Sequence, residues 1–211
     1  MTDISASLCP LIFRDKPLRA FSGIRFVGSL NDIESGRSVT DDLLITHFGI
    51  SGPAALDFSS FASEAVTLSF ITELSESEFI AQFNDLRLGK NSIKKFLKQF
   101  LPQRLVQFHL DRSNVDQDFI ADLSKTKLQL LIKSLFHYEL PTRQANVYPG
   151  SWTTKGGVSV DQVQTKNLES KKIPGLYFAG EVLDFNGLCG GYNISFAMIS
   201  AQIVADDILS L

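Results

Sequence analysis

Apolar residues follow two different spacings along this chain, first at the intervals of short strands and then at helical intervals. Within residues 8–71, short apolar stretches such as 21–30 and 43–46 are separated by polar turn residues. This pattern predicts a small sheet or barrel of short strands. Pro53 comes directly after the glycine-containing turn 49–52. Because proline suits the first position of a helix, we expect a helix to begin there.

A helical block is predicted over residues 75–140. Ser75 and Glu78 have the spacing of a capping box, in which a hydroxyl and a carboxylate satisfy free N–H groups at the start of a helix. Apolar residues then recur at helical spacing and are expected to face a core. They are Phe79, Ile80, Phe83, Leu86, Ile93, Phe96, Leu97, Phe100, Leu101, Leu105, Val106, Phe108, Leu128, Leu131, Ile132, Leu135 and Phe136.

The end of the chain is predicted to form strand, turn, strand, glycine-rich loop and helix. We place a domain boundary near Thr142, because Pro141 and the polar stretch 144–150 interrupt the helical pattern. The expected fold class is therefore α+β. Its parts are a first domain over residues 1–142, strand-rich at 8–71 and helical at 75–140, and a second domain over 143–211.

Composition and charge narrow the choice of partners. The chain has 211 residues, 44% of them apolar, which is enough for a core. The formal net charge is −3 and the charges are interspersed, so we expect neither a nucleic-acid partner nor a membrane partner. Cys9 and Cys189 belong to no metal-ligand motif, and no metal site is expected. No leader-like N-terminus and no apolar run of about 18 residues occurs, so the expected location is the cytoplasm.

The main chemical signal lies near the C-terminus. A strand is predicted over residues 173–181, and it would deliver Gly180 and Glu181 at the edge where open α/β sheets bind ligands, with Glu181 placed to accept a sugar hydroxyl. Gly190 and Gly191 would let the backbone approach a ring, and the next helix would point free N–H groups at it. This positive end stabilises the negative charge of a reduced flavin, so flavin fits better than nicotinamide. The alternative is a tight turn that binds nothing.

Several blocks of the sequence resemble, in the same order, those of a family of bacterial flavoproteins. The blocks are Thr46-His47-Phe48-Gly49-Ile50-Ser51-Gly52-Pro53, Leu101-Pro102-Gln103-Arg104-Leu105, Gly156-Gly157-Val158, Glu169-Ser170-Lys171, Pro174-Gly175-Leu176-Tyr177-Phe178-Ala179-Gly180-Glu181, Leu183-Asp184 and Gly190-Gly191-Tyr192-Asn193. The family is described as NAD(P)/FAD-dependent or aminoacetone-oxidase-like oxidoreductases, and it includes enzymes that reduce unsaturated oxo-steroid bile acids. The resemblance implies a Rossmann-like FAD domain that is interrupted by an inserted substrate domain, here residues 8–140.

The resemblance also implies FAD as the cofactor, NAD(P)H as an electron donor and a small organic molecule as the substrate. Carried over by position, the cofactor-binding residues are Thr154, Gly156, Gly157, Gly180, Glu181, Gly190, Gly191, Tyr192 and Asn193. Gly180 and Glu181 would face the ribityl-pyrophosphate region of FAD, and the last four residues would lie against the isoalloxazine.

One departure from the family concerns the phosphate loop. The chain contains no G-x-G-x-x-G fingerprint, which holds the pyrophosphate in Rossmann-type domains. We therefore expect a fragment, an incomplete gene product or half of a split enzyme whose Rossmann half is a separate chain. The elements from Gly157 onward would then expose apolar surface.

Few side chains are candidates for direct chemistry. His47 is the candidate catalytic residue, because it lies in a family motif and histidine titrates near neutrality; the alternative is a packing role at the turn. Cys189 is expected to pack, although a redox role is conceivable beside the flavin. Ser51 lacks the spacing of a hydrolase nucleophile. The expected function is FAD-dependent hydride or electron transfer, and the alternative is a non-catalytic remnant or binding module that retains no flavin.

Overall fold

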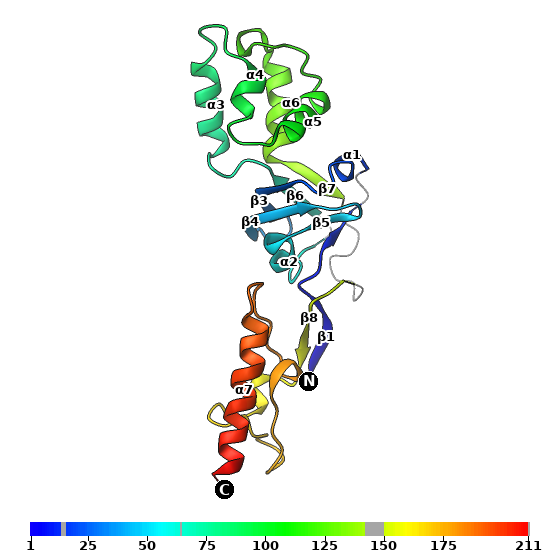
Figure 1. Cartoon of the computed structure of the whole chain (residues 1–211), viewed down its shortest axis with the longest axis vertical. Helices are drawn as coiled ribbons and strands as arrows, with labels where there is room; N and C mark the ends of the chain where they lie inside the picture. The colour runs from blue at the N-terminus through cyan, green and yellow to red at the C-terminus, as the bar shows by residue number, and fades with distance from the viewer. Residues whose placement is uncertain (14–15, 64, 142–149, 211) are drawn as a thin grey trace.

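The computed structural model describes residues 1–13, 16–63, 65–141 and 150–210. It confirms the α+β class. Along the longest axis, a block of helices lies at one end, a curled six-stranded sheet lies in the middle and the C-terminal helix lies at the other end (Figure 1). The expected boundary near Thr142 falls outside the described residues.

The six-stranded sheet is antiparallel at every pairing. In spatial order its strands are β2 (Leu11–Ile12), β5 (Gly49–Ser51), β4 (Ser38–Ile45), β3 (Arg25–Asp32), β6 (Ala65–Ser69) and β7 (Tyr138–Pro141). Side chains of β3 alternate, with Phe26 and Leu30 buried and Val27 exposed, as expected for a strand with one face on the core. Helix α1 (Lys16–Arg19) follows β2 in the chain, and helix α2 (Pro53–Phe58) packs against β4. Pro53 occupies the first turn of α2, which confirms the prediction.

The helical block confirms the predicted capping box at Ser75. Its helices are α3 (Glu76–Asp85), α4 (Ile93–Leu97), α5 (Gln103–Arg112), η1 (Ile120–Asp122) and α6 (Lys125–Phe136). At α3 the Ser75 hydroxyl accepts from the Glu78 N–H at 3.3 Å, and the Glu78 carboxylate accepts from the Ser75 N–H at 2.8 Å. Ser92 and Ser124 cap α4 and α6 through their hydroxyls.

The helical block is inserted between two neighbouring strands of the sheet. Leu68 of β6 pairs with Tyr138 of β7, so the chain leaves the sheet and returns to it at adjacent positions. The inserted helices therefore leave β6 and β7 as direct neighbours in the sheet.

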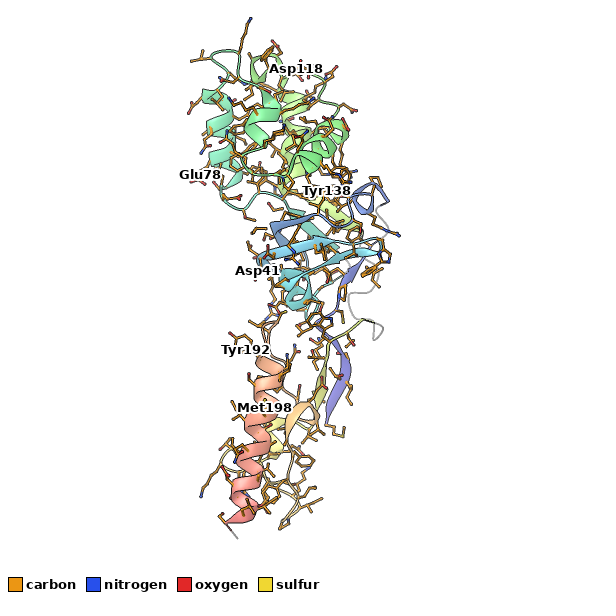
Figure 2. All side chains as sticks on the ribbon, in the orientation of Figure 1. Asp41, Glu78, Asp118, Tyr138, Tyr192 and Met198 are labelled. Carbon is orange, nitrogen blue, oxygen red and sulfur yellow. The ribbon has the colours of Figure 1, made fainter. Side chains whose placement is uncertain are left out.

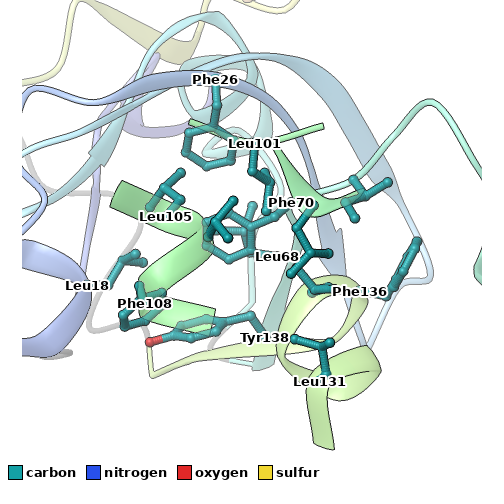
Figure 3. Close-up of a cluster of buried hydrophobic side chains, with 14 of the residues drawn as sticks. Leu18, Phe26, Leu68, Phe70, Leu101, Leu105, Phe108, Leu131, Phe136 and Tyr138 are labelled. Carbon is teal, nitrogen blue, oxygen red and sulfur yellow. The ribbon is translucent and has the colours of Figure 1, made fainter. Parts of the chain in front are cut away.

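One hydrophobic core joins the sheet to the helices. Phe70 lies at its centre: its ring stacks on Phe26 with centroids 5.0 Å apart and meets Tyr138 edge-on at 5.6 Å. Figure 3 shows Leu105 and Phe108 of α5 pointing into the same cluster. Aromatic pairs of this kind contribute about 0.5–1.5 kcal/mol beyond the area they bury. The sheet and the helical block thus share one core.

His109 is buried in this core and predicts a pH dependence of stability. Burial, and secondly the charge of Arg112, lower its pKa from 6.5 to about 3. Below pH 6.5 the His109 imidazole takes up a proton in the unfolded chain but not in the folded chain, which favours unfolding. The stability that neutral His109 contributes is therefore fully present above pH 6.5 and is lost as the pH falls towards 3. We expect the free energy of unfolding to fall by roughly 1 kcal/mol per pH unit through this range because of His109.

Urea unfolding at a series of pH values tests this expectation. The Nδ1 atom of His109 lies 2.8 Å from the Ser134 hydroxyl, so the suitable comparison is the pair His109→Met with Ser134→Ala, which removes both polar groups. In the double variant, the free energy of unfolding should depend less on pH below pH 6.5. In Ser134→Ala alone, it should depend on pH as in the parent chain. Identical slopes in the parent and the double variant would contradict the assignment.

The C-terminal part contains a two-stranded ribbon and one long helix. Strand β1 (Thr2–Ser7) pairs antiparallel with β8 (Thr153–Gly157), so the first residues of the chain lie beside its C-terminal part. Two short 3-10 turns, η2 (Val160–Gln162) and η3 (Gly180–Val182), lead to α7 (Tyr192–Leu209).

The strand predicted over residues 173–181 is wrong. Tyr177 forms an isolated bridge with Glu169, and Ala179 is extended with φ −142° and ψ 151°. A strand needs a neighbour that accepts and donates backbone hydrogen bonds. Within the described residues, no named strand lies beside this segment, so it keeps an extended course without ladder pairing.

Helix α7 is exposed over most of its surface. Ser200 is its one buried residue, while Tyr192, Ile194 and Met198 are 60%, 70% and 70% exposed. Figure 2 shows Tyr192 and Met198 projecting from this helix. An apolar patch of this kind is typical of an interaction surface. Among the described helices, none combines the length and the apolar character needed to cross a bilayer.

Candidate active site

The N-terminal end of α7 presents unsatisfied backbone donors. Gly190 and Gly191 have φ of 121° and 93°, which favours glycine, and Gly191 caps the helix without a side-chain hydrogen bond. The first helical bond runs from the Ser195 N–H to the Gly191 carbonyl at 2.9 Å. The N–H groups of Tyr192 and Asn193 have no acceptor among the described residues. This end therefore carries positive partial charge that a ligand can meet.

Asn193 closes the glycine-rich loop into a rigid ring. Its Oδ1 accepts from the Gly187 N–H at 2.9 Å, and its Nδ2 donates to the Gly187 carbonyl at 2.9 Å. A Cβ at Gly187 would lie 2.9 Å from the Cβ of Tyr192, so the loop requires glycine here. Asn193 thus holds the loop in place beside the free N–H groups.

An apolar cavity of about 160 Å³ opens beside this loop. Its lining residues are Leu8, Trp152, Thr153, Leu188, Cys189, Gly190, Gly191, Asn193 and Ile194. Trp152 is 70% exposed, so its indole is available to a flat ring. Leu8 has φ 49°, an uncommon conformation for leucine, and it is buried where the chain passes from β1 to the sheet. The cavity therefore lies at the junction of the sheet and the C-terminal part.

Asp57 of α2 ties the glycine-rich loop to the sheet. Its Oδ1 accepts from the Cys189 N–H at 2.6 Å. Burial raises the pKa of Asp57, the Cys189 N–H opposes this and Asp41 adds to it. Burial, and then the Asp57 and Asp41 carboxylates, also raise the pKa of the Cys189 thiol. Cys189 is therefore favoured as a neutral thiol next to the cavity.

Ser60 adds two further links between the same parts. Its carbonyl accepts from Lys155 Nζ at 2.6 Å, and its hydroxyl accepts from Asn186 Nδ2 at 3.3 Å. The end of α2 is consequently bonded both to β8 and to the loop that precedes α7.

Glu181 and Gly180 lie close to β8 and α7. Glu181 Oε1 accepts from the Thr154 N–H at 2.7 Å, and its other oxygen has no hydrogen-bond partner among the described residues. The Gly180 N–H donates to the Ser200 hydroxyl at 2.9 Å, so Ser200 fixes the turn η3 on α7. Glu181 thus keeps one oxygen for a ligand hydroxyl.

Gly156 and Gly157 allow backbones to approach closely. A Cβ at Gly156 would lie 2.0 Å from the Asp3 carbonyl oxygen, and a Cβ at Gly157 would lie 2.4 Å from that of Val182. The Gly156 N–H donates to Asp184 Oδ1 at 3.1 Å. These glycines join β1, β8 and η3, the scaffold behind the loop.

The structure does not bring His47 together with the other predicted site residues. His47 is exposed at the turn between β4 and β5, where its carbonyl accepts from Arg19 Nε at 2.5 Å and its ring meets Phe48 edge-on. It is not among the residues that line the cavity. Its catalytic role stays a prediction that the geometry does not favour.

Comparison with known proteins agrees with this architecture. The family model described as "HI0933-like protein barrel and H2TH domain" matches residues 5–150. The chain belongs to the HI0933-like family. The curled sheet and the helices α3 to α6 lie within the part of the chain that this description covers.

Curated relatives extend the HI0933-like match over nearly the whole chain. It is 35% identical to the "Ribosomal RNA dihydrouridine synthase" of Haemophilus influenzae, over 95% of this chain and 50% of the relative. It is 31% identical to the protein of the same name from Escherichia coli, over 92% and 48%. It is 28% identical to the "3-dehydro-bile acid delta(4,6)-reductase" of Clostridium scindens, over 96% and 53%. The chain spans about half the length of these relatives.

Sequence reasoning missed two residues that organise this HI0933-like site, Asp57 and Ser60. A signal was available for Asp57, because a carboxylate in the last turn of a helix is unfavourable beside the helix dipole unless it has a partner elsewhere. Asp57 is in that position in α2, and its partner is the N–H of Cys189. Ser60 bonds through its carbonyl and its hydroxyl to residues far along the chain, and the sequence carries no sign of that.

Proposed function

We propose that this chain forms the flavin-facing and substrate-facing part of an FAD-dependent reductase that adds hydrogen across a conjugated carbon–carbon double bond. The names of the relatives support the reaction class, because a dihydrouridine synthase and a delta(4,6)-reductase both saturate such a bond in a ring. NAD(P)H is the proposed source of electrons.

The observation that carries the proposal is the juxtaposition of free N–H groups and a small apolar cavity at the start of α7. The cavity of about 160 Å³ is below the roughly 300–1,000 Å³ typical of pockets for drug-sized ligands, so it suits the edge of a flat ring. Gly190 and Gly191 leave the approach open, since no heavy atom lies within 4 Å of a Cβ at Gly191. These residues fit the isoalloxazine of FAD. When bound, FAD would supply the hydride for the reduction.

The residues of this chain would bind and orient the ligands. The N–H groups of Tyr192 and Asn193 would hold the electron-rich edge of the flavin ring, and the free oxygen of Glu181 would accept a hydroxyl of its sugar chain. Trp152 and Leu188 would exclude water and stack against the substrate ring. No side chain of the described site is assigned as an acid or base.

The ADP half of FAD requires a segment that this chain does not show. We propose that a segment with a glycine-rich phosphate loop, from the same protein or a separate chain, packs on the exposed apolar surface of α7. The surface provides Tyr192, Ile194, Met198 and Ile199 for that contact.

A uracil base in structured RNA is the proposed substrate, because the relatives named for ribosomal RNA share the higher identities. The overall charge predicted no nucleic-acid partner, and on this point the proposal departs from that prediction. A conjugated oxo-steroid is the second candidate, favoured by the apolar lining of Trp152, Leu188 and Ile194.

Reconstitution tests the proposal. The purified chain would be titrated with FAD, alone and with the dinucleotide-binding half of a relative, and the complex would then receive NADPH with an RNA stem-loop or an unsaturated oxo-steroid. We expect flavin fluorescence to change and one substrate to gain the mass of two hydrogen atoms per reduced ring. A chain that remains colourless and inactive with the added half would support the non-catalytic module instead.

A further inference from the structure

One continuous stretch of the helical block contains basic residues but no acidic ones. Between Asp85 and Asp111 the chain contains six basic residues and no carboxylate: Arg87, Lys90, Lys94, Lys95, Lys98 and Arg104. The whole chain has 20 basic and 23 acidic residues and a net charge of −3, so the residues outside this stretch carry −3 − 6 = −9. An overall acidic protein with one basic stretch is attracted to a polyanion through that stretch and repelled elsewhere.

Helix α4 and its C-cap residue Lys98 present three of these charges on one exposed face. Ile93, Phe96 and Leu97 are buried in the core. The remaining residues of this turn, Lys94, Lys95 and Lys98, are exposed, and at about 100° per residue they lie within one third of the helix circumference. None of the three forms an ion pair with a described carboxylate. Their charges are therefore available to an external anion.

The loop before α4 holds an apolar tip between the cations. Leu88 is 91% exposed, and Gly89 follows it with φ 126°. The loop is fixed rather than free, because Asn91 Nδ2 donates to the Leu86 carbonyl at 2.7 Å and the Asn91 carbonyl accepts from the Ile120 N–H at 2.9 Å. An exposed leucine beside lysines suits a surface where a sugar or base edge lies next to phosphates.

Acidic side chains border this surface on one side. Ile93 donates its N–H to the Asp118 carbonyl at 3.0 Å, which brings the segment of Asp116 and Asp118 beside the start of α4. Asp116 is paired with Lys127. Phe119, 37% exposed, lies in the same segment and bridges Ser92. The carboxylates restrict the approach of a phosphate backbone to the lysine face.

We propose that Lys94, Lys95, Lys98 and the loop 87–91 form a docking surface for the phosphate backbone of a folded RNA. This rests on the proposed function, in which a base of the same RNA reaches the flavin that is held beside Gly190. The helical block lies at one end of the molecule, and the start of α7 lies on the other side of the sheet from it (Figure 1); Asp118 and Tyr192 mark the two regions in Figure 2. A substrate held at both places has to be large, as a structured RNA is and a steroid is not.

The test measures binding of a fluorescein-labelled RNA stem-loop to the chain by anisotropy at several salt concentrations, without flavin. The variant K94Q/K95Q/K98Q should bind about tenfold more weakly, and the slope of log K against log salt should flatten by about two to three, since each lost phosphate contact removes about 0.7–0.9. The matched control is K166Q/K171Q/K172Q, which removes the same charge from exposed lysines of the C-terminal part and should keep the parent slope to within about one.

Three outcomes would overturn the docking surface. The first is that the parent chain does not bind the RNA, and the second is that both triple variants weaken binding equally. The third is that polyglutamate competes for the chain as well as unlabelled RNA does. The thermal midpoint of each variant confirms that it is folded. Failure of the proposed function is distinguishable. A chain that binds RNA through α4 but never retains FAD contradicts the reductase alone, whereas an active reductase of the oxo-steroid that does not bind RNA contradicts the docking surface and the uracil substrate but not the reductase.

Discussion

Alanine in place of Gly156 is expected to lower the free energy of unfolding by about 3 kcal/mol or more, because two penalties act together. Gly156 has φ 89°, and a Cβ there would lie 2.0 Å from the Asp3 carbonyl oxygen. The neighbouring atom is backbone, so β1 would have to move away from β8. Since Gly156 also donates its N–H to Asp184, this shift would loosen the scaffold behind the glycine-rich loop.

Urea unfolding of Gly156→Ala and Gly36→Ala separates the two penalties. Gly36 also has positive φ, 69°, but a Cβ there meets nothing within 4 Å. Its substitution should cost only the backbone term, about 1–2 kcal/mol. Equal losses in the two variants would show that contact between β1 and β8 contributes little.

The second large effect is expected on flavin binding, from Gly191→Ala. The added methyl group meets no protein atom within 4 Å, so the chain should fold with a loss of about 1–2 kcal/mol from its φ of 93°. The same methyl group would occupy the space where we place the isoalloxazine, beside the free N–H groups of α7. We therefore expect FAD affinity to fall at least about tenfold, which corresponds to roughly 1.4 kcal/mol.

Gly23→Ala is a closely matched control for this experiment. Gly23 has the same φ of 93°, and a Cβ there also meets nothing within 4 Å, but it lies before β3 and does not line the cavity. Both variants should lose similar stability, and only Gly191→Ala should lose flavin fluorescence quenching in the reconstituted protein. Parent-like FAD affinity in Gly191→Ala would remove the isoalloxazine from this loop.

Local chemistry made much of the fold predictable. The Ser75–Glu78 capping box, the helix start at Pro53 and the helical spacing of Leu128, Leu131 and Leu135 all depend on residues close in sequence, and all appear in the structure. The pairing of β1 with β8 joins residues about 150 positions apart, and no local pattern announces it. The strand predicted before Gly180 failed for a related reason, because strand propensity does not supply a neighbouring strand.

The candidate site also combines features that local sequence predicts with contacts that it does not predict. The sequence located the glycine-rich loop, since Gly190 and Gly191 precede a helical pattern, and the structure places both at the cavity. The sequence could not show that Asp57 bonds Cys189 or that Glu181 bonds Thr154, because these contacts depend on how distant elements meet. It favoured His47 on a motif, whereas the turn that carries His47 lies apart from the loop.

The placement of the helical block between adjacent strands has an evolutionary consequence. Because Leu68 and Tyr138 are direct neighbours in the sheet, helices α3 to α6 can be lengthened, shortened or exchanged during descent without altering the register of any strand. The glycine-rich loop is fixed through α2 and β8 and is insulated from such exchange. A lineage can thus replace this one cassette while it keeps the glycine-rich loop and its supports unchanged.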